Sequence, residues 1–259
     1  APAPSVAEFE GGMMNAVGLA NPGLEAVRDE HIPWLAAHLP QTRKIVNVVG
    51  FVTDEFAAVV SGLEAALTGG QTSAVDAYEI NVSCPNVKAG GMEFGADRAA
   101  LRAVVASVRA ATKRPVFVKL SPVLPNIADA AHISADAGAD GITVVNTIPG
   151  LLIDVERRRP ILGFGTGGVS GPAILPVGVL ATWKVRQAVS LPVLGVGGVA
   201  SAEDALQYVM AGASLVGIGT AAMRDPRAPE RIVADLDQWC ARHSVKNIQE
   251  LTGTLEWPH

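Results

Sequence analysis

The sequence predicts an α/β fold in which buried parallel strands alternate with amphipathic helices. Three observations lead to this prediction: six short apolar runs recur along the 259 residues, alanine-rich stretches of helical length separate them, and no charged linker interrupts the alternation. Six such units favour a (β/α) barrel or a doubly wound sheet. We expect a single domain over residues 1–259.

The expected strands are short apolar runs, most of them rich in β-branched residues. Such runs are typical of strands that are buried on both faces of a parallel sheet. They are Ile45–Val49, Tyr78–Val82, Val116–Leu120, Ile142–Val145, Val193–Val196 and Leu215–Ile218.

The stretches between these runs have the apolar spacing of helices that cross over between parallel strands. Ser201 and Asp204 have the spacing of a capping box, and Gly138 and Gly212 stand where a helix should end before the next strand. The expected helices are Asp54–Leu67, Arg98–Thr112, Ile127–Ala137, Leu180–Val189 and Ala202–Met210.

Composition excludes several classes of protein. Apolar residues make up 49% of the chain and charged residues 17%, which favours a folded core over a disordered chain. The net charge of −5 argues against a nucleic acid as the main partner. The longest uncharged run, between Asp204 and Arg224, contains polar residues and glycines, so it predicts a helix and a strand rather than a membrane span.

Cysteine and histidine are sparse and have no metal-ligand spacing. The two cysteines, Cys84 and Cys240, are too few for a metal cluster or a disulfide framework. The five histidines fall on expected helices or in the tail, so we expect no metal site. A reducing cytoplasm is the simplest location for a protein with so few cysteines.

Polar and turn-forming residues follow every expected strand. A barrel builds its active site from the loops at the carboxyl ends of its strands, so this pattern favours the barrel, although six strands do not close an eight-stranded one. The residues are Gly50, Asn81–Pro85, Lys119–Pro122, Asn146–Thr147, Gly197–Gly198 and Gly219–Thr220.

Two glycine turns end the last two expected strands, at Gly195–Gly198 and Gly217–Thr220. In barrels this is where backbone N–H groups commonly bind a phosphate, so the pair predicts a phosphate site. The alternative is that the glycines only permit tight turns. A third group, Gly165–Pro172, either covers the same ligand or is a flexible loop.

Cys84 and Lys119 are the two candidate reactive groups. Cys84 follows a strand and precedes a polar segment, where a thiol can act as base or nucleophile. A small buried apolar residue is its alternative role, and Cys240 is expected to be structural. Lys119 lies in an apolar run, where its charge needs a partner, which favours a ligand-facing role.

Four asparagines near strand ends offer neutral donors and acceptors. Such groups suit a planar substrate rich in amides more than a simple anion, although each could instead be a turn residue. They are Asn15, Asn81, Asn86 and Asn146.

Four segments together resemble the catalytic subunit of class 1 dihydroorotate dehydrogenase, in order along nearly the whole chain. The segments are Asn15–Gly23, Ile80–Lys88, Val118–Pro122 and Gly197–Val199. The continuation Lys88–Gly91, with Phe94 and Gly95 after it, is more similar to the NAD-linked class 1B than to the fumarate-using class 1A.

The resemblance implies a (β/α)8 TIM barrel that oxidises dihydroorotate to orotate with FMN, in pyrimidine biosynthesis. By this resemblance Cys84 is the base that takes the C5 proton while the C6 hydride goes to the flavin. The implied substrate residues are Asn15, Gly18, Leu19, Asn81, Asn86, Asn146 and Thr147. The implied cofactor residues are Asn81, Lys119, Ser170, Gly171, Gly197, Gly198, Gly219 and Thr220. The implied partners are a subunit with FAD and an iron–sulfur cluster, and a second copy of the chain in a heterotetramer.

The chain departs from the family at its beginning. Family members carry about fifty further residues there, which form the first two strands of the eight-stranded barrel. We therefore expect an N-terminally incomplete barrel. The alternatives are a truncated fragment without activity, a class 1A enzyme that uses fumarate, and a phosphate-binding barrel, such as an isomerase or aldolase, without flavin.

Overall fold

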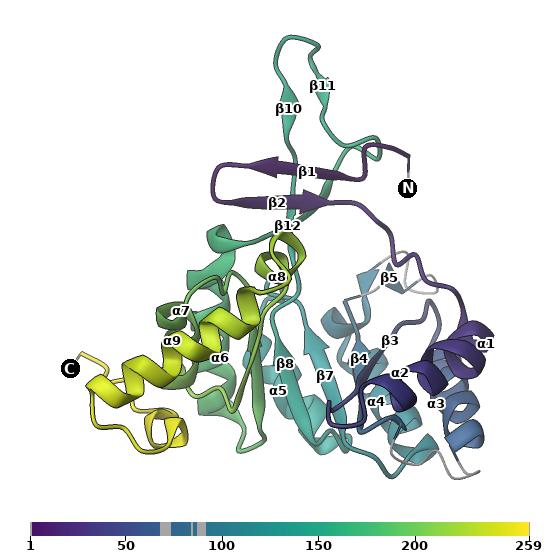
Figure 1. Ribbon diagram of the computed structural model, residues 1–259. Helices are drawn as coiled ribbons and strands as arrows, with labels where there is room; N and C mark the ends of the chain where they lie inside the picture. Colours follow the sequence, from purple (N-terminus) through teal and green to yellow (C-terminus); the bar gives the residue numbers. More distant parts are fainter. Residues whose placement is uncertain (1, 68–73, 84, 87–91, 259) are drawn as a thin grey trace. The chain divides into compact units, whose positions relative to one another are not determined.

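The computed structural model describes residues 2–67, 74–83, 85–86 and 92–258 (Figure 1). Its internal contacts divide the chain into two compact units, which are described separately. Unit 1 comprises Ala1–Gly18, Ser121–Val123 and Val144–His259, and unit 2 comprises Leu19–Leu120 and Leu124–Thr143.

Unit 2 is built on parallel strands. β3 (Ile45–Val48), β4 (Ala77–Asn81) and β7 (Val116–Leu120) pair in parallel, and β8 (Gly141–Val144) follows β7 in the sheet. Each strand therefore lies beside its neighbour in the sequence, without the reversal of order that defines a doubly wound sheet.

Three helices pack against the strands of unit 2: α3 (Thr53–Leu67), α4 (Arg98–Ala111) and α5 (Ile127–Asp136). Asp97 caps α4 by accepting hydrogen bonds from two backbone N–H groups of its first turn. The smaller elements of the unit are α1 (Leu24–Ala26), η1 (Val27–His31), α2 (Ile32–His38), β5 (Pro85–Asn86), β6 (Met92–Glu93) and η4 (Phe94–Ala96).

Side chains alternate along these strands. Tyr78, Ile80 and Val118 are fully buried, whereas Glu79 and Lys119, which point to the opposite face, are only partly buried. The buried face forms the core with the helices. The other face carries the polar groups.

Unit 1 contains the last two parallel strands, β13 (Val193–Val196) and β14 (Leu215–Gly217). Tyr208 of α7, Val199 and Ile232 belong to its apolar core. The helices of this unit are η5 (Pro172–Ile174), α6 (Leu175–Ala188), α7 (Ala202–Ala211), α8 (Thr220–Arg224), α9 (Ala228–Arg242) and η6 (Ile248–Leu251).

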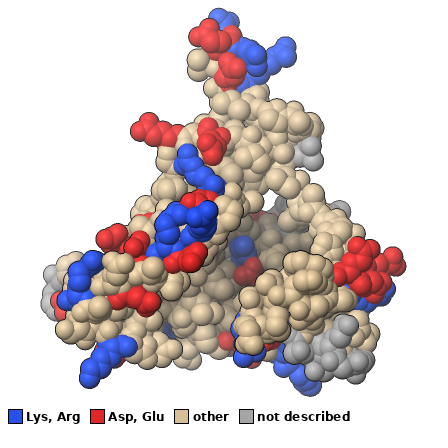
Figure 2. All heavy atoms as spheres, in the orientation of Figure 1, with Lys and Arg blue, Asp and Glu red and all other residues tan. Residues whose placement is uncertain are grey.

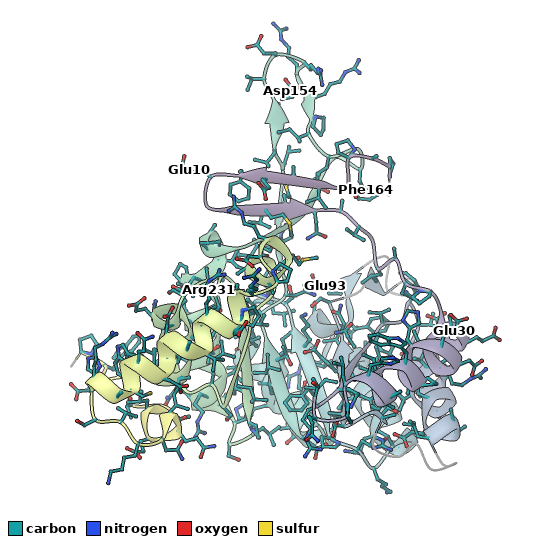
Figure 3. All side chains as sticks on the ribbon, viewed as in Figure 1. Glu10, Glu30, Glu93, Asp154, Phe164 and Arg231 are labelled. Carbon is teal, nitrogen blue, oxygen red and sulfur yellow. The ribbon has the colours of Figure 1, made fainter. Side chains whose placement is uncertain are left out.

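An antiparallel sheet completes unit 1. Its order is β1 (Val6–Phe9), β2 (Gly12–Asn15), β12 (Gly167–Ser170) and β9 (Ile148–Gly150). A hairpin of β10 (Ile153–Asp154) and β11 (Arg159–Pro160) projects from it (Figure 1). Acidic and basic side chains gather at the tip of this hairpin (Figure 2), where Asp154 lies (Figure 3).

The structure confirms the six expected strands and the five expected helices. Their ends shift by one residue at most, except for one helix that begins earlier than predicted. α6 begins at Leu175, five residues before the predicted Leu180, because Pro172–Ile174 already forms a turn that leads into it. The capping box of Ser201 and Asp204 is present, and Gly138 and Gly212 both have positive φ. The strands and helices fit a (β/α)8 barrel.

The antiparallel sheet was not predicted. The group Gly165–Pro172 was expected to cover a ligand or form a flexible loop, and residues 167–170 within it form β12, which pairs with β2 and β9. Among the described residues, no helix is long and apolar enough to cross a membrane.

Candidate functional site

Glu79 links two neighbouring polar side chains in unit 2. It lies opposite Asn47 in the register of β3 and β4, and its carboxylate accepts a hydrogen bond of 2.5 Å from the Asn47 amide. The Lys119 Nζ on β7 lies 3.8 Å from the same carboxylate oxygen. Lys119 and Glu79 are 24% and 13% exposed, so solvent screens this ion pair only partly.

The predicted need of Lys119 for a partner is thus met by a carboxylate of the same chain. Sequence reasoning missed Glu79 and Asn47. The signal was available, because Glu79 interrupts an apolar run as Lys119 does, and it stands two residues before Asn81, on the same face of the strand.

The end of β4 carries the predicted Asn81. Its side chain is 8% exposed, and its Oδ1 accepts a hydrogen bond of 3.3 Å from the backbone N–H of Ser83. The Ser83 hydroxyl is buried and has no hydrogen-bond partner within the described part of the chain.

Cys84 lies outside the described residues, as do residues 87–91, and the side chain of Asn86 is not described either. Glu93, on β6 after that segment, is labelled in Figure 3. The predicted roles of Cys84 and Asn86 therefore stay predictions.

Other predicted substrate residues follow strands of unit 1. Asn15 ends β2 and lies opposite Gly168 of β12, and the side chain of Thr147 lies against Gly168. The Asn146 Oδ1 accepts a hydrogen bond of 2.8 Å from the Thr147 backbone N–H. Asn15, Thr147 and β12 are thereby brought together.

Gly18 and Leu19 follow this sheet in the sequence, and both have positive φ. Gly18 tolerates this conformation, whereas Leu19, at φ 59°, is an unusual case because its side chain disfavours it. Backbone in this region often marks a functional turn.

The turn after β13 has the properties expected of a phosphate site. Gly197 and Gly198 have φ values of 133° and 79°, and a Cβ on Gly198 would lie 2.7 Å from the backbone nitrogen of Leu175. Only glycine fits there. Tyr208 fixes the turn, because its hydroxyl donates a hydrogen bond of 2.7 Å to the Gly197 carbonyl.

Two predicted cofactor residues meet beside β12. The Thr220 hydroxyl donates a hydrogen bond of 2.8 Å to the Ser170 hydroxyl, although the two residues are 50 positions apart. A Cβ on Gly219 would meet open space, and Gly171 approaches the backbone of Gly12 closely. Hydroxyls and accessible backbone N–H groups are suitable donors to phosphate, so these residues fit a phosphate-bearing cofactor.

A cavity within unit 2 lies apart from Glu79 and Lys119. It has a volume of about 420 Å³ and is lined by Glu64 of α3 and residues 110–114. Glu64 accepts hydrogen bonds from Thr112 and Arg114 at 2.8 and 3.0 Å. The cavity adjoins the amino end of β7, whereas Lys119 lies near the carboxyl end of that strand.

Among the described residues, no group of three or more potential metal ligands was found. Cys240, predicted to be structural, is partly buried on α9. Arg231 of the same helix, labelled in Figure 3, forms an ion pair with Asp225 at 2.7 Å.

Comparisons with known proteins show the family of the chain. The family model described as "Dihydroorotate dehydrogenase" matches residues 1–239. A protein of Trichlorobacter lovleyi named "Dihydroorotate dehydrogenase B (NAD(+)), catalytic subunit" is 44% identical over 98% of this chain and 81% of its own length. A protein of Cutibacterium acnes with the same name is 45% identical over 95% of this chain and 78% of its own length.

A solved structure supports the fold. The dihydroorotate dehydrogenase of Eimeria tenella, in complex with ferulenol, matches with a TM-score of 0.78 and 21% sequence identity. The match covers 98% of this chain and 74% of that structure.

Proposed function

The chain belongs to the dihydroorotate dehydrogenase family, and from this premise we propose that it is the catalytic subunit of an NAD-linked enzyme that oxidises dihydroorotate to orotate. The observation that carries the proposal is the identity of 44% over 98% of the chain to a relative with that name. The reaction belongs to pyrimidine biosynthesis. The relatives of Trichlorobacter lovleyi and Cutibacterium acnes both carry NAD(+) in their names, which favours NAD over fumarate.

The oxidation removes a proton from C5 and a hydride from C6 of the substrate. We assign the proton to Cys84, whose thiolate would accept it. FMN, when bound, supplies the two-electron acceptor for the hydride. Asn15, Gly18, Leu19, Asn81, Asn86, Asn146 and Thr147 would bind the carboxylate and ring amides of the substrate.

FMN is the proposed cofactor because the residues around the glycine turns fit it. Asn81 and Lys119 would contact the ring, where a cation stabilises the negative charge of the reduced flavin. The residues that would bind the ribityl chain and phosphate are Ser170, Gly171, Gly197, Gly198, Gly219 and Thr220. Support comes from the positive φ of the turn after β13 and from the Ser170–Thr220 hydrogen bond.

The name "catalytic subunit" of the relatives implies a separate partner subunit for those proteins. We propose that the partner of this chain carries FAD and an iron–sulfur cluster, and that two copies of the chain form the core of a heterotetramer. We place the enzyme in the cytoplasm, where a catalytic thiol stays reduced.

The proposal is tested by the colour of the purified full-length protein. It should be yellow, and its flavin absorbance should bleach when dihydroorotate is added without oxygen, because the substrate reduces the cofactor. A flavin that stays oxidised would contradict the substrate assignment.

The role of Cys84 is tested with the same assay. Cys84→Ala should still bind FMN but bleach at least 100-fold more slowly, because general-base catalysis contributes about 10²- to 10⁴-fold. Cys240→Ala is the matched control and should bleach at the normal rate. Equal rates for both variants would remove Cys84 from the mechanism.

A further inference from the structure

The side chains of Asn47, Glu79 and Lys119 form a row across β3, β4 and β7, which we call the polar row. The Asn47 amide donates to Glu79 at 2.5 Å, and Lys119 lies 3.8 Å from the same oxygen. All three belong to unit 2, and all three lie on the sheet face opposite the apolar core.

Glu79 has no place in the proposed mechanism. It is a carboxylate on the face that carries the predicted cofactor residues Asn81 and Lys119, and an anion there opposes the binding of negative charge. Its side chain is 13% exposed, so water does not screen it fully. Asn47 and Lys119 offset the free-energy cost of partly burying this carboxylate.

The electrostatic effect of Glu79 on a flavin at Lys119 has a definite sign. A flavin gains negative charge on reduction, and a cation beside it favours the reduced form. Glu79 offsets the charge of Lys119 and holds the ammonium group near β4. It therefore reduces the preference of this site for the reduced flavin.

We propose that Glu79 is a positioning residue for Lys119 that lowers the reduction potential of the bound flavin, an inference that rests on the proposed function. The lower potential makes the reduced flavin a stronger electron donor. An enzyme that passes electrons on toward NAD needs such a donor, because NAD is itself a weak oxidant. Asn47 fixes the Glu79 carboxylate in the orientation that contacts Lys119.

The test is the midpoint potential of FMN in the purified full-length protein, measured against a reference dye. Glu79→Gln keeps the shape and the hydrogen-bond acceptor but removes the charge. We expect a tenfold shift of the oxidation equilibrium toward reduced flavin, which is a rise of about 30 mV for a two-electron couple.

Glu64→Gln is the matched control. Glu64 is also partly buried and ion-paired, with Arg114 at 3.0 Å, but it lies on α3 beside the amino end of β7. Its variant should leave the potential unchanged even if it lowers the stability of the fold. If Glu79 had only a structural role, Glu79→Gln would leave the potential unchanged, as Glu64→Gln should.

Asn47→Ala is a second test, at an exposed position, where substitutions usually change stability little. It removes the donor that holds Glu79, so we expect a smaller shift in the same direction, about threefold or 14 mV. An unchanged or lower potential in Glu79→Gln overturns the inference. If that variant does not retain flavin, an unchanged or lower potential in Asn47→Ala overturns it.

Different results would overturn the proposed function and the role of Glu79. An unaltered protein that binds no FMN, or whose flavin dihydroorotate does not bleach, overturns the proposed function and this inference with it. A normal enzyme whose potential does not respond to Glu79 overturns the role of Glu79 alone.

Discussion

Tyr208 shows how one side chain can shape a binding turn. It is fully buried on α7, and a Cβ on either Gly178 or Gly195 would collide with it, so two glycines make room for its ring. Its hydroxyl donates to the Gly197 carbonyl at 2.7 Å. Burial raises the pKa of Tyr208, which keeps the hydroxyl protonated and able to donate.

We predict that Tyr208→Phe weakens FMN binding by roughly fivefold, because the loss of a hydrogen bond of about 1 kcal/mol frees the turn that would bind the phosphate. Binding of riboflavin, which lacks the phosphate, should be unchanged. Both affinities are measured by titrating the apoprotein with flavin and following flavin fluorescence.

Tyr78→Phe is a matched control, since Tyr78 is the other of the two tyrosines in the sequence and is also fully buried. It lies in unit 2, where burial, followed by Glu64, raises its pKa, whereas the glycine turn belongs to unit 1. An equal loss of riboflavin and FMN affinity in Tyr208→Phe would indicate general damage to the fold and refute the prediction.

At the scale of elements, the sequence was sufficient for the repeating strands and helices. Each strand of the parallel sheet is a short run of buried apolar residues, and its immediate neighbour along the chain is its partner in the sheet, so local pattern and topology agree. Helix ends could also be predicted from local sequence, as the capping box at Ser201 and the positive φ of Gly212 confirm.

The antiparallel sheet was missed for the opposite reason. β2 and β12 pair through Asn15 and Gly168, which are more than 150 residues apart, and β12 itself contains two glycines. Glycines carry no strand signal, and pairing over such a separation leaves no local pattern. The Ser170–Thr220 hydrogen bond also leaves no local pattern, because only the fold brings these two residues into contact.

The beginning of β3 is joined to the beginning of β4 by Asp76. Its carboxylate accepts hydrogen bonds from the Lys44 backbone N–H at 2.8 Å and from Arg43 at 2.7 Å. The hydrogen bond from the Lys44 N–H, and to a lesser extent the one from Arg43, holds the pKa of Asp76 below its usual value. The ionised form is therefore the one that stabilises this end of the sheet.

We predict that Asp76→Asn lowers the free energy of unfolding at neutral pH. A carboxyl whose pKa is lower in the folded state stabilises the fold above its unfolded pKa of about 3.9, and loses this effect as pH falls through the folded pKa. The difference between the two proteins should therefore shrink at acidic pH.

Urea denaturation over a range of pH measures this difference. Asp235→Asn, an exposed position on α9, controls for the loss of one negative charge and should show little change. A difference between Asp76→Asn and the unaltered protein that stays constant down to the lowest pH would contradict the assigned cause.

At the scale of the whole molecule, the predicted site residues are divided between the two units. Asn81 and Lys119 lie in unit 2, whereas Ser170, Gly197 and Thr220 lie in unit 1. Asn81, Gly197 and Thr220 were predicted from their position at strand ends and Lys119 from its charge in an apolar run, whereas the family resemblance implied Ser170. Sequence reasoning did not identify Glu79 or Tyr208, because each acts on another protein group rather than on a ligand.

The cysteines of the sequence are too few to ligate an iron–sulfur cluster. Such clusters take four cysteine ligands, and the sequence contains two cysteines. We therefore predict that the protein alone reduces its flavin with dihydroorotate but forms NADH at a negligible rate. Addition of the partner subunit should restore NADH formation.

The measurement is the absorbance of NADH formed from dihydroorotate and NAD without oxygen, with and without the partner. Fumarate in place of NAD is the control for a class 1A activity, and it should not reoxidise the flavin of the isolated protein. NADH formation by the isolated protein at the rate of the complex would show that the flavin reduces NAD directly. In that case the flavin, with the low potential that we assign to the effect of Glu79, would pass its electrons to NAD itself rather than to a cofactor of the partner.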